Sequence, residues 1–398
     1  MVGLLWGVAL LNYLDRQMLS TMKPTMMLDI PELQSATYFG QLMAIFLWIY
    51  GLTSPIAGIL ADRISKSKLI IGSLFVWSAV TLSMGFATNF QQLYLLRAIM
   101  GISEAIYIPA GLALIATYHS SKTRSLAVGL HMTGLYMGQA LGGFGATIAK
   151  KLSWAHSFQL FGLIGIVYAV VLFLFLRDNA HSSKRIETIK PSPVSSLRFL
   201  FTTFPFWILL FYFAMSSIPG WAIKNWLPTL LAERLQLDMS IAGPISTISI
   251  AFSSLLGVLI GGTVSDRWVQ KNIRARIFTS AIGLALTIPA LVSLGMGSTI
   301  FHLIAAALFF GLGFGLFDAN NMPILCQIVP ASARATAYGL MNMTGVFAGA
   351  FITDWLGKSV DAGNLARDFI GMAVVIVIVL LIQLIFLRPT VHDVAVKN

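Results

Sequence analysis

Apolar runs of about 20 residues recur along the whole chain, and short polar connections separate them. A helix needs about 20 such residues to cross about 30 Å of hydrocarbon. Only 10% of the residues are charged, against about 25% in soluble domains. We therefore predict an all-α membrane protein with twelve transmembrane helices, near residues 3–28, 38–60, 69–87, 91–117, 124–148, 156–177, 204–231, 241–263, 275–295, 299–327, 334–357 and 367–388.

One polar stretch, rich in serine, proline and basic residues, interrupts this pattern in the middle of the chain. It predicts three parts: an N-terminal six-helix bundle at 1–177, a cytoplasmic linker at 178–203 and a C-terminal six-helix bundle at 204–398. The two halves share a motif, GILADR at 58–63 and GTVSDR at 262–267. Repeated six-helix halves predict pseudo-symmetric bundles with a substrate site between them at mid-membrane, as in secondary transporters.

Lysine and arginine fall mostly in alternate connections. Positively charged loops stay on the cytoplasmic side of a membrane. The pattern predicts a multi-pass protein of the cell membrane with both termini in the cytoplasm. The same loops account for most of the net charge of +11, so we expect no nucleic acid partner.

The remaining features argue against chemistry on a cofactor. Cys326 is the only cysteine, so no disulfide can form within the chain. We find no nucleotide-binding loop, metal-ligand cluster or nucleophile–base motif. The first residues, MVGLLWGVAL, have neither a basic region nor a cleavage site, and we interpret them as a spanning helix. We expect no enzyme activity, no metal and no cofactor.

Two adjacent charges, Asp15 and Arg16, lie inside the first apolar run. A charge at bilayer depth costs free energy, so it usually faces a partner or a cavity and serves a function. Tyr13, Arg16 and Lys23 fall on one helical face, which predicts a polar stripe directed away from lipid.

The fourth predicted helix carries a second set of charged residues within an apolar run. Arg97, Gly101 and Glu104 share a face at i, i+4 and i+7. Gly101 leaves room for a neighbouring helix or a ligand. Asp15 and Glu104 could also form a purely structural link between the first and fourth helices, and this alternative stays open.

Three motifs carry a resemblance to a known family. The repeated G-x-x-x-D-R turn resembles the signature of the major facilitator superfamily, and it implies that superfamily's fold. NYLDR at 12–16 and RAIMGISEAIYIPA at 97–110 resemble its anion:cation symporters. The resemblance implies proton-coupled import of an organic anion, most of all a sugar acid of the hexuronate or aldonate type. It also implies alternating access in a bacterial inner membrane. We expect a monomer whose partners are the small anion and the lipid bilayer.

The resemblance also implies roles for four residues. Arg16 would bind the substrate carboxylate, and Asp15 and Glu104 would be the protonatable pair, to which Arg97 couples. An anion on Arg16 would weaken that cation's effect on Asp15, so substrate and proton would bind together. The proton is then the coupling ion.

Further candidates line the predicted cavity. Some sugar-acid members have a glutamine directly after a glycine of the fifth helix; here Leu135 follows Gly134, and Gln139 comes about one turn later. Pro219-Gly220 predicts a helix break before Trp221 and Lys224, which could hold an anion or lie at the membrane interface. Asparagine side chains can form hydrogen bonds with sugar hydroxyls or with neighbouring helices. The substrate-binding candidates are Arg16, Tyr13, Tyr50, Lys224, Trp221, Asn321, Asn342 and Gln139, while the roles of His131 and Asp318 stay open.

The charged residues of the repeated cytoplasmic turns predict gates. Salt bridges there would favour an outward-facing state, and inward opening would break them. The predicted gate residues are Asp62, Arg63, Arg124, Asp266, Arg267 and Arg334.

Two other cargoes fit the same fold. Arg16 of the N-terminal half and Lys224 of the C-terminal half could together bind a phosphate group, as in an organophosphate/phosphate antiporter. The sequence EA-x-Y at 104–107 resembles spinster-like carriers and implies lysolipid transport. A channel or a membrane enzyme is disfavoured, because no motif supports it.

Overall fold

The computed structural model describes residues 1–119, 124–178, 193–330 and 333–389. All regular secondary structure in these ranges is helical. The elements are α1 (Val2–Met26), η1 (Pro31–Gln34), α2 (Ala36–Arg63), α3 (Lys66–Met84), α4 (Phe90–Tyr118), α5 (Arg124–Gly142), α6 (Gly145–Leu152), α7 (Trp154–Phe175), α8 (Pro193–Thr202), α9 (Phe204–Leu235), α10 (Met239–Trp268), α11 (Ala275–Met296), α12 (Ile300–Asp318), α13 (Asn321–Ile328), α14 (Arg334–Asp361) and α15 (Leu365–Phe386).

Nine helical segments of the described chain are long and apolar enough to cross a membrane, and α12 and α13 together make one of them. Nine of the twelve predicted spans thus correspond to helical segments of the described chain that could cross a membrane. The other three correspond to α1, α5 and α14, which are less apolar because they carry polar residues such as Asp15, His131 and Asn342. Their crossing of the membrane stays a prediction.

Two predicted helices are broken in the structure. The fifth, expected at 124–148, ends at Gly142, and the short α6 begins at Gly145. A side chain at Gly143 would collide with Thr247 of α10, so close approach of another helix accompanies this break. The tenth, expected at 299–327, ends at Asp318 and resumes at Asn321. The break expected at Pro219-Gly220 is wrong, because α9 continues through both residues from Phe204 to Leu235.

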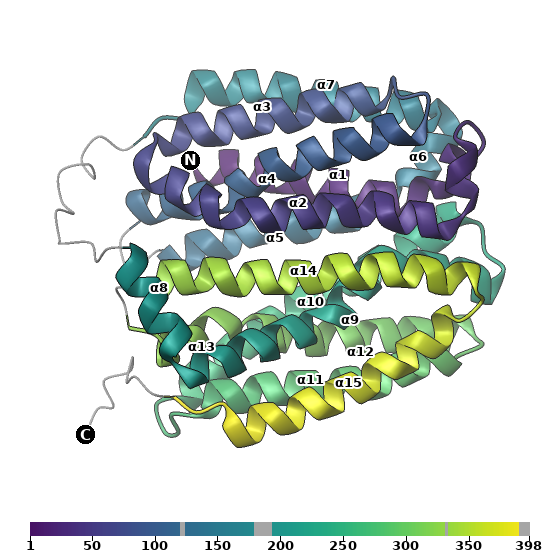
Figure 1. The fold of residues 1–398 in the computed structure, drawn as a ribbon. Helices are drawn as coiled ribbons and strands as arrows, with labels where there is room; N and C mark the ends of the chain where they lie inside the picture. Colours follow the sequence, from purple (N-terminus) through teal and green to yellow (C-terminus); the bar gives the residue numbers. More distant parts are fainter. Residues whose placement is uncertain (120–123, 179–192, 331–332, 390–398) are drawn as a thin grey trace.

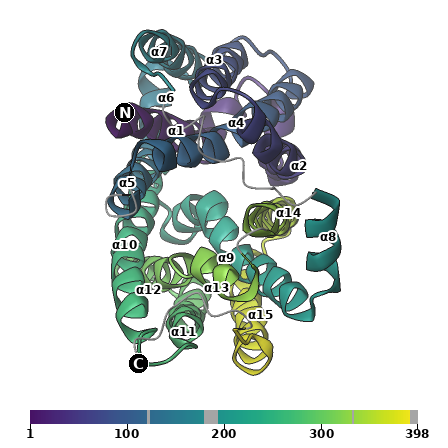
Figure 2. The same ribbon diagram turned by 90° about the vertical axis from the view of Figure 1, so that its left-hand side faces the viewer.

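The helices form two groups with the same packing pattern (Figures 1 and 2). In the first group, α1 packs against α5, α2 against α4, and α3 against α7. In the second group, α9 packs against α14, α10 against α12, and α11 against α15. The pattern agrees with an internal repeat. The predicted linker at 178–203 falls largely on 179–192, outside the described residues, and its described part includes α8, so the domain boundaries stay a prediction.

The two groups meet along α2 with α14 and along α5 with α10. Polar contacts join them near the end that carries α6, opposite to α8 in Figure 1. Lys150 Nζ lies 2.5 Å from Asp238 Oδ2. The Asp361 carboxylate accepts hydrogen bonds from Ser35 Oγ at 2.6 Å and from the backbone N–H of Thr37 at 2.9 Å, at the start of α2. These contacts hold the groups together at the predicted outer end.

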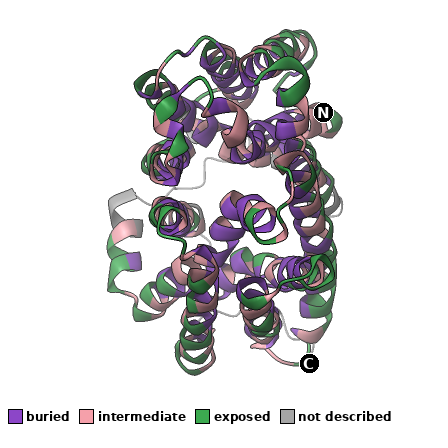
Figure 3. Ribbon diagram, turned by 90° about the vertical axis from the view of Figure 1, so that its right-hand side faces the viewer, coloured by how far each residue is buried: buried purple, intermediate pink, exposed green. Residues whose placement is uncertain are grey.

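Buried residues face neighbouring helices, and exposed residues lie on the outer flanks of the bundle (Figure 3). Many of the exposed residues are large and apolar. Phe173 and Phe301, for example, are 73% and 76% exposed. Large exposed apolar patches mark surfaces that contact a partner or a membrane. Here they cover the flanks of the long helices, so lipid would face them.

Gly101 provides a test of the helix packing. A Cβ atom at this position would lie 2.7 Å from the Phe46 carbonyl oxygen of α2. Overpacking costs about 1–3 kcal/mol, so Gly101→Val should lower the melting temperature of the detergent-solubilised protein. Gly72→Val is the matched control, since nothing lies within 4 Å of a Cβ atom there. Equal melting of both variants would contradict the close contact of α2 with α4.

The Lys150–Asp238 pair provides a second test. The hydrogen bond from Lys150, together with those from Ser240, lowers the pKa of Asp238 to about 2. The ionised Asp238 carboxylate should stabilise the fold fully above pH 3.9, which is about the pKa of an aspartate in the unfolded chain. This stabilisation should be lost as the pH falls toward 2. The melting temperatures of wild type and Asp238→Asn should therefore differ by a constant, small amount from pH 5 to pH 8. A difference that changes within that window would refute this assignment.

Candidate functional site

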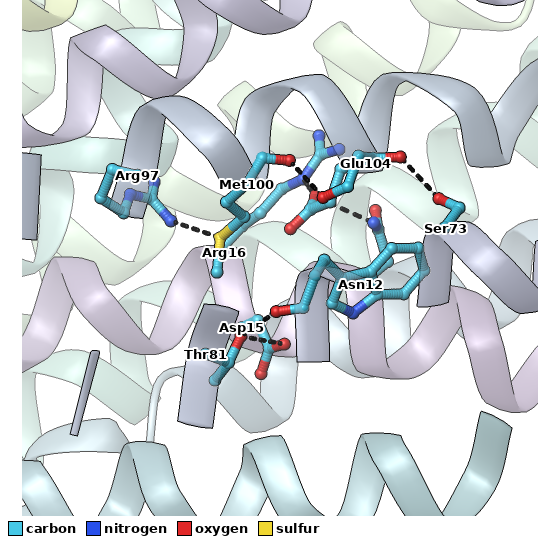
Figure 4. A network of polar contacts seen from close by, with 10 residues as sticks. Asn12, Asp15, Arg16, Ser73, Thr81, Arg97, Met100 and Glu104 are labelled. Atoms are coloured by element: carbon cyan, nitrogen blue, oxygen red, sulfur yellow. Dashed lines mark hydrogen bonds and ion pairs between the residues drawn. The ribbon is translucent and has the colours of Figure 1, made fainter. Parts of the chain in front are cut away.

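The polar centre of the first group lies between α1 and α4 (Figure 4). Arg16 Nε lies 2.5 Å from Glu104 Oε2, which makes a direct ion pair. Asn12 Nδ2 donates a hydrogen bond of 2.9 Å to the same oxygen. Asn12 and Arg16 are four residues apart, so one face of α1 presents both to Glu104.

This centre is almost sealed from solvent. Glu104 is 0% exposed, Arg97 is 3% exposed and Asp15 is 4% exposed. The Arg16 side chain is more accessible, at 13%. Breaking a buried ion pair is costly, because it leaves a charge without compensation. Because its side chain is the most accessible of the four, Arg16 is the member of the centre that an incoming anion can reach first.

Asp15 does not contact its neighbour in the sequence. Its Oδ2 accepts a hydrogen bond of 3.2 Å from Thr81 Oγ1 of α3 (Figure 4). Successive side chains leave a helix about 100° apart, so Asp15 points to α3 while Arg16 points to α4. Asp15 still lies within electrostatic range of Glu104 and Arg97. It occupies a second layer behind the ion pair.

Aromatic rings surround the guanidinium groups. Arg16 Cζ lies 4.7 Å from the ring centre of Tyr50 and 5.2 Å from that of Tyr13. The Phe46 ring lies 4.8 Å from Arg16 Cζ and 4.6 Å from Arg97 Cζ. Cation–π contacts of this kind stabilise a cation by about 0.5–2 kcal/mol. They hold Arg16 in place without using its hydrogen-bond donors.

The ion pair has unused hydrogen-bonding capacity. Among the described residues, Arg16 Nη2 and Glu104 Oε1 are buried atoms with no hydrogen-bond partner. Buried polar atoms in proteins are normally paired, and exceptions need an explanation. A free donor on Arg16 is suited to a carboxylate, and a free oxygen on Glu104 is suited to a proton.

A small cavity of about 30 Å³ lies on the side of the second group. It has room for about two water molecules. Gln139 of α5, Lys224 of α9 and Asp318 of α12 line it. Lys224 Nζ lies 5.2 Å from the Trp221 ring and 6.0 Å from the Tyr13 ring. Tyr13 thus connects the cavity to Arg16, and Lys224 is at the centre of the bundle rather than at a membrane interface.

Three other candidates lie elsewhere. Asn321 is buried and donates to Asp318 Oδ1 at 3.4 Å. Asn342 is partly buried on α14 and is not among the residues that line the cavity. His131 is buried against Tyr107, with 5.8 Å between ring centres, and does not line the cavity either.

The gate residues are only partly described. The side chains of Asp62, Arg63 and Arg124 lie outside the described residues. Asp266 Oδ1 lies 3.5 Å from Arg276 Nη2. Arg267 is exposed at the end of α10, and Arg334 Nη2 donates to the Cys326 carbonyl at 3.0 Å. Their role as gates stays a prediction.

The sequence reasoning missed three residues of the site. Asn12 binds Glu104, Thr81 binds Asp15, and Phe46 contacts both arginines. Asn12 had a signal, because it lies one turn before Arg16 on the same face. Thr81 and Phe46 had none, since apolar helices contain many such residues. The described residues contain no group of three or more His, Cys, Asp or Glu side chains that could hold a metal ion.

Removal of one partner tests the ion pair. Glu104→Ala leaves the Arg16 charge buried without its carboxylate, so unfolding should require about 3–5 kcal/mol less than in the wild type. The double variant Arg16→Met with Glu104→Leu should recover much of that loss, because it removes both charges. Thermal melting in detergent measures both effects, with the exposed Glu233→Ala as the control. Unchanged melting of Glu104→Ala would argue against the pair.

The chain is similar to known proteins in fold and in sequence. A bacterial homologue of the human lysosomal transporter Spinster, solved in an inward-facing conformation, superposes with a TM-score of 0.79 at 19% identity, covering 96% of this chain and 95% of that one. The hexuronate transporter of Bacillus subtilis is 25% identical over 87% of this chain and 89% of its own length. The D-galactonate transporter of Escherichia coli O6:H1 is 25% identical, covering 78% of this chain and 77% of the relative.

A further relative is matched over a shorter part. The "Probable L-galactonate transporter" of Escherichia coli K12 is 28% identical over 68% of this chain, and the match spans 61% of that relative's length. The model of the Major Facilitator Superfamily matches residues 5–353, which is most of the chain. The repeated helix packing, the polar centre and this match together identify the chain as a member of the Major Facilitator Superfamily, and hence as a multi-pass membrane transporter.

Proposed function

We propose that the protein imports an organic anion, a sugar acid of the hexuronate or aldonate type, together with protons and by alternating access. Relatives named as hexuronate and galactonate transporters support the substrate class. The observation that carries the proposal is the Arg16–Glu104 pair, a buried cation held by an acid at the centre of the bundle. We expect it to act as a monomer in a bacterial inner membrane, with the proton as its coupling ion.

The Arg16–Glu104 contact would couple substrate binding to proton binding. A substrate carboxylate on Arg16 would replace the Glu104 oxygen that lies 2.5 Å from Nε. Glu104 would then be a buried carboxylate without its cation, and burial of an isolated charge is unfavourable. Proton uptake by Glu104 removes that charge. The anion and the proton thereby enter together.

Asp15 would serve as a second acid in this scheme. It has no direct contact with Arg16, but its carboxylate interacts electrostatically with Glu104 and Arg97. Neutralisation of Glu104 would therefore change the electrostatic environment of Asp15. Its almost complete burial means that protons would reach it through the centre rather than from bulk solvent.

The membrane potential gives a reason for proton coupling. Movement of one charge across the membrane changes its free energy by about 2.3 kcal/mol per 100 mV. A lone anion would enter a negatively charged cell against this field. One proton makes the step electroneutral, and a second lets the potential drive uptake.

Alternating access would use the two groups of helices as moving parts. The cavity of about 30 Å³ is too small for a sugar acid, so the groups must separate to admit one. The contacts of Asp361 with the start of α2 and of Lys150 with Asp238 would break when the predicted outer end opens. The predicted gate residues would make and break their contacts at the opposite, cytoplasmic end of the bundle.

An organophosphate/phosphate antiporter is the second candidate. Arg16 and Lys224 both lie against Tyr13, one from each group, and two cations suit a phosphate. Phosphate counterflow without proton movement would favour this alternative over sugar-acid symport.

Proton uptake tests the main proposal. Purified wild type in weakly buffered detergent solution should take up protons when D-galactonate or D-glucuronate is added. Glu104→Gln should bind the acid without this proton uptake, and Asp15→Asn should transport at a strongly reduced rate in proteoliposomes. Arg16→Ala should lose binding, as a thermal-shift assay with the same acids can measure. No proton uptake in the wild type, together with normal transport by Asp15→Asn, would rule the mechanism out.

A further inference from the structure

A break inside a membrane span places an acid at the centre of the bundle. Residues Ile300–Ile328 form one candidate span, but α12 ends at Asp318 and α13 begins at Asn321. Discontinuous helices in transporters commonly build substrate sites, because the break frees polar groups at membrane depth. In the sequence, this interruption coincides with the polar run FDANN at 317–321.

Asp318 faces the cavity that Lys224 and Gln139 line. Its side chain is exposed although it lies at the middle of a spanning segment. Tyr136 of α5 and Ser254 of α10 line the same cavity. The lining therefore offers an acid, a cation, an amide and two hydroxyls from both groups of helices.

Neighbours within the second group hold Asp318 in place. Asn321 Nδ2 donates to Asp318 Oδ1 at 3.4 Å. The Tyr212 hydroxyl donates to Asn321 Oδ1 at 3.4 Å and also contacts the Ser280 hydroxyl. Asn321 is thus a positioning residue for Asp318, and this explains its burial away from the cavity.

The cavity and Arg16 belong to one site. The Tyr13 ring centre lies 5.2 Å from Arg16 Cζ and 6.0 Å from Lys224 Nζ. The two cations are therefore no farther apart than these two distances added together. An acid of six carbons with its carboxylate on Arg16 would extend its other end toward Lys224 and Asp318.

We propose that Asp318 selects the cargo by its distal end, accepting hydroxyl groups there and rejecting a second carboxylate. The inference rests on the proposed import of sugar acids and adds a specificity residue to it. A carboxylate accepts hydrogen bonds from hydroxyls, and Lys224 and Gln139 donate to the same groups. A second carboxylate would meet the like charge of Asp318, and specificity often depends on such a repulsive element. The preferred substrates are then monocarboxylic sugar acids.

Matched pairs of acids test this assignment. D-galactonate and galactarate, or D-glucuronate and D-glucarate, share a six-carbon chain and differ in the second carboxylate. Binding to the full-length protein in detergent and uptake into proteoliposomes should favour the monocarboxylate of each pair. In Asp318→Asn that preference should fall by roughly tenfold or more, because the amide keeps an acceptor but loses the charge.

Control variants separate specificity from folding. Asp318→Glu keeps the charge and should retain the wild-type preference. Asp354→Asn removes an acid that pairs with Lys358 on α14, outside the cavity, and should leave the preference unchanged. Melting temperatures identify variants that fail to fold, and Asp318→Ser then replaces Asp318→Asn.

The outcomes distinguish this inference from the proposed function. A wild type that prefers the dicarboxylates, or a preference that Asp318→Asn leaves unchanged, overturns the role of Asp318 while sugar-acid import stands. A wild type that neither binds nor imports any of the four acids overturns both proposals.

Discussion

The contact of Arg16 with Glu104 is the interaction on which the rest of the site depends. A charge at bilayer depth is costly, and it is tolerated where a partner or a cavity receives it. The pair lies 2.5 Å apart between α1 and α4, and rings of Tyr50 and Phe46 cover the guanidinium. The same contact that lets these helices stay in the membrane is the contact that an anionic cargo must replace. Structure and transport therefore use one ion pair.

The two groups of helices repeat in packing but differ in chemistry. Equivalent helices pair in the same order in both groups, which is a property of the backbone and of small residues at the crossings. The first group holds two acids and two arginines in a sealed centre. The second group presents Lys224 and Asp318 to a cavity. The two groups thus share one packing pattern but contribute different residues to the site. In the proposed function, the first group binds the proton and the second group binds the end of the substrate that lies away from Arg16.

Much of the architecture could be predicted from periodicity and charge. The apolar runs gave the spans, the GILADR and GTVSDR turns gave the repeat, and the spacing of Arg97, Gly101 and Glu104 placed them on one helical face. These features are local, so a single helix suffices to define them. Gly101 proved to admit α2 rather than a ligand, because the backbone of Phe46 lies against it.

The sequence by itself determined that charges lie within apolar runs of spanning length, and its resemblance to a known family assigned Arg16 and Glu104 to one site. Only the tertiary structure decided which charges meet. Asp15 is adjacent to Arg16 in the chain, yet the rotation of the helix turns it to Thr81 of α3, while Glu104 comes from a helix 88 residues away. The break at Asp318 and the meeting of Lys224 with Tyr13 were likewise decided by packing. Contacts between distant segments depend on how helices cross, and no local pattern encodes that geometry.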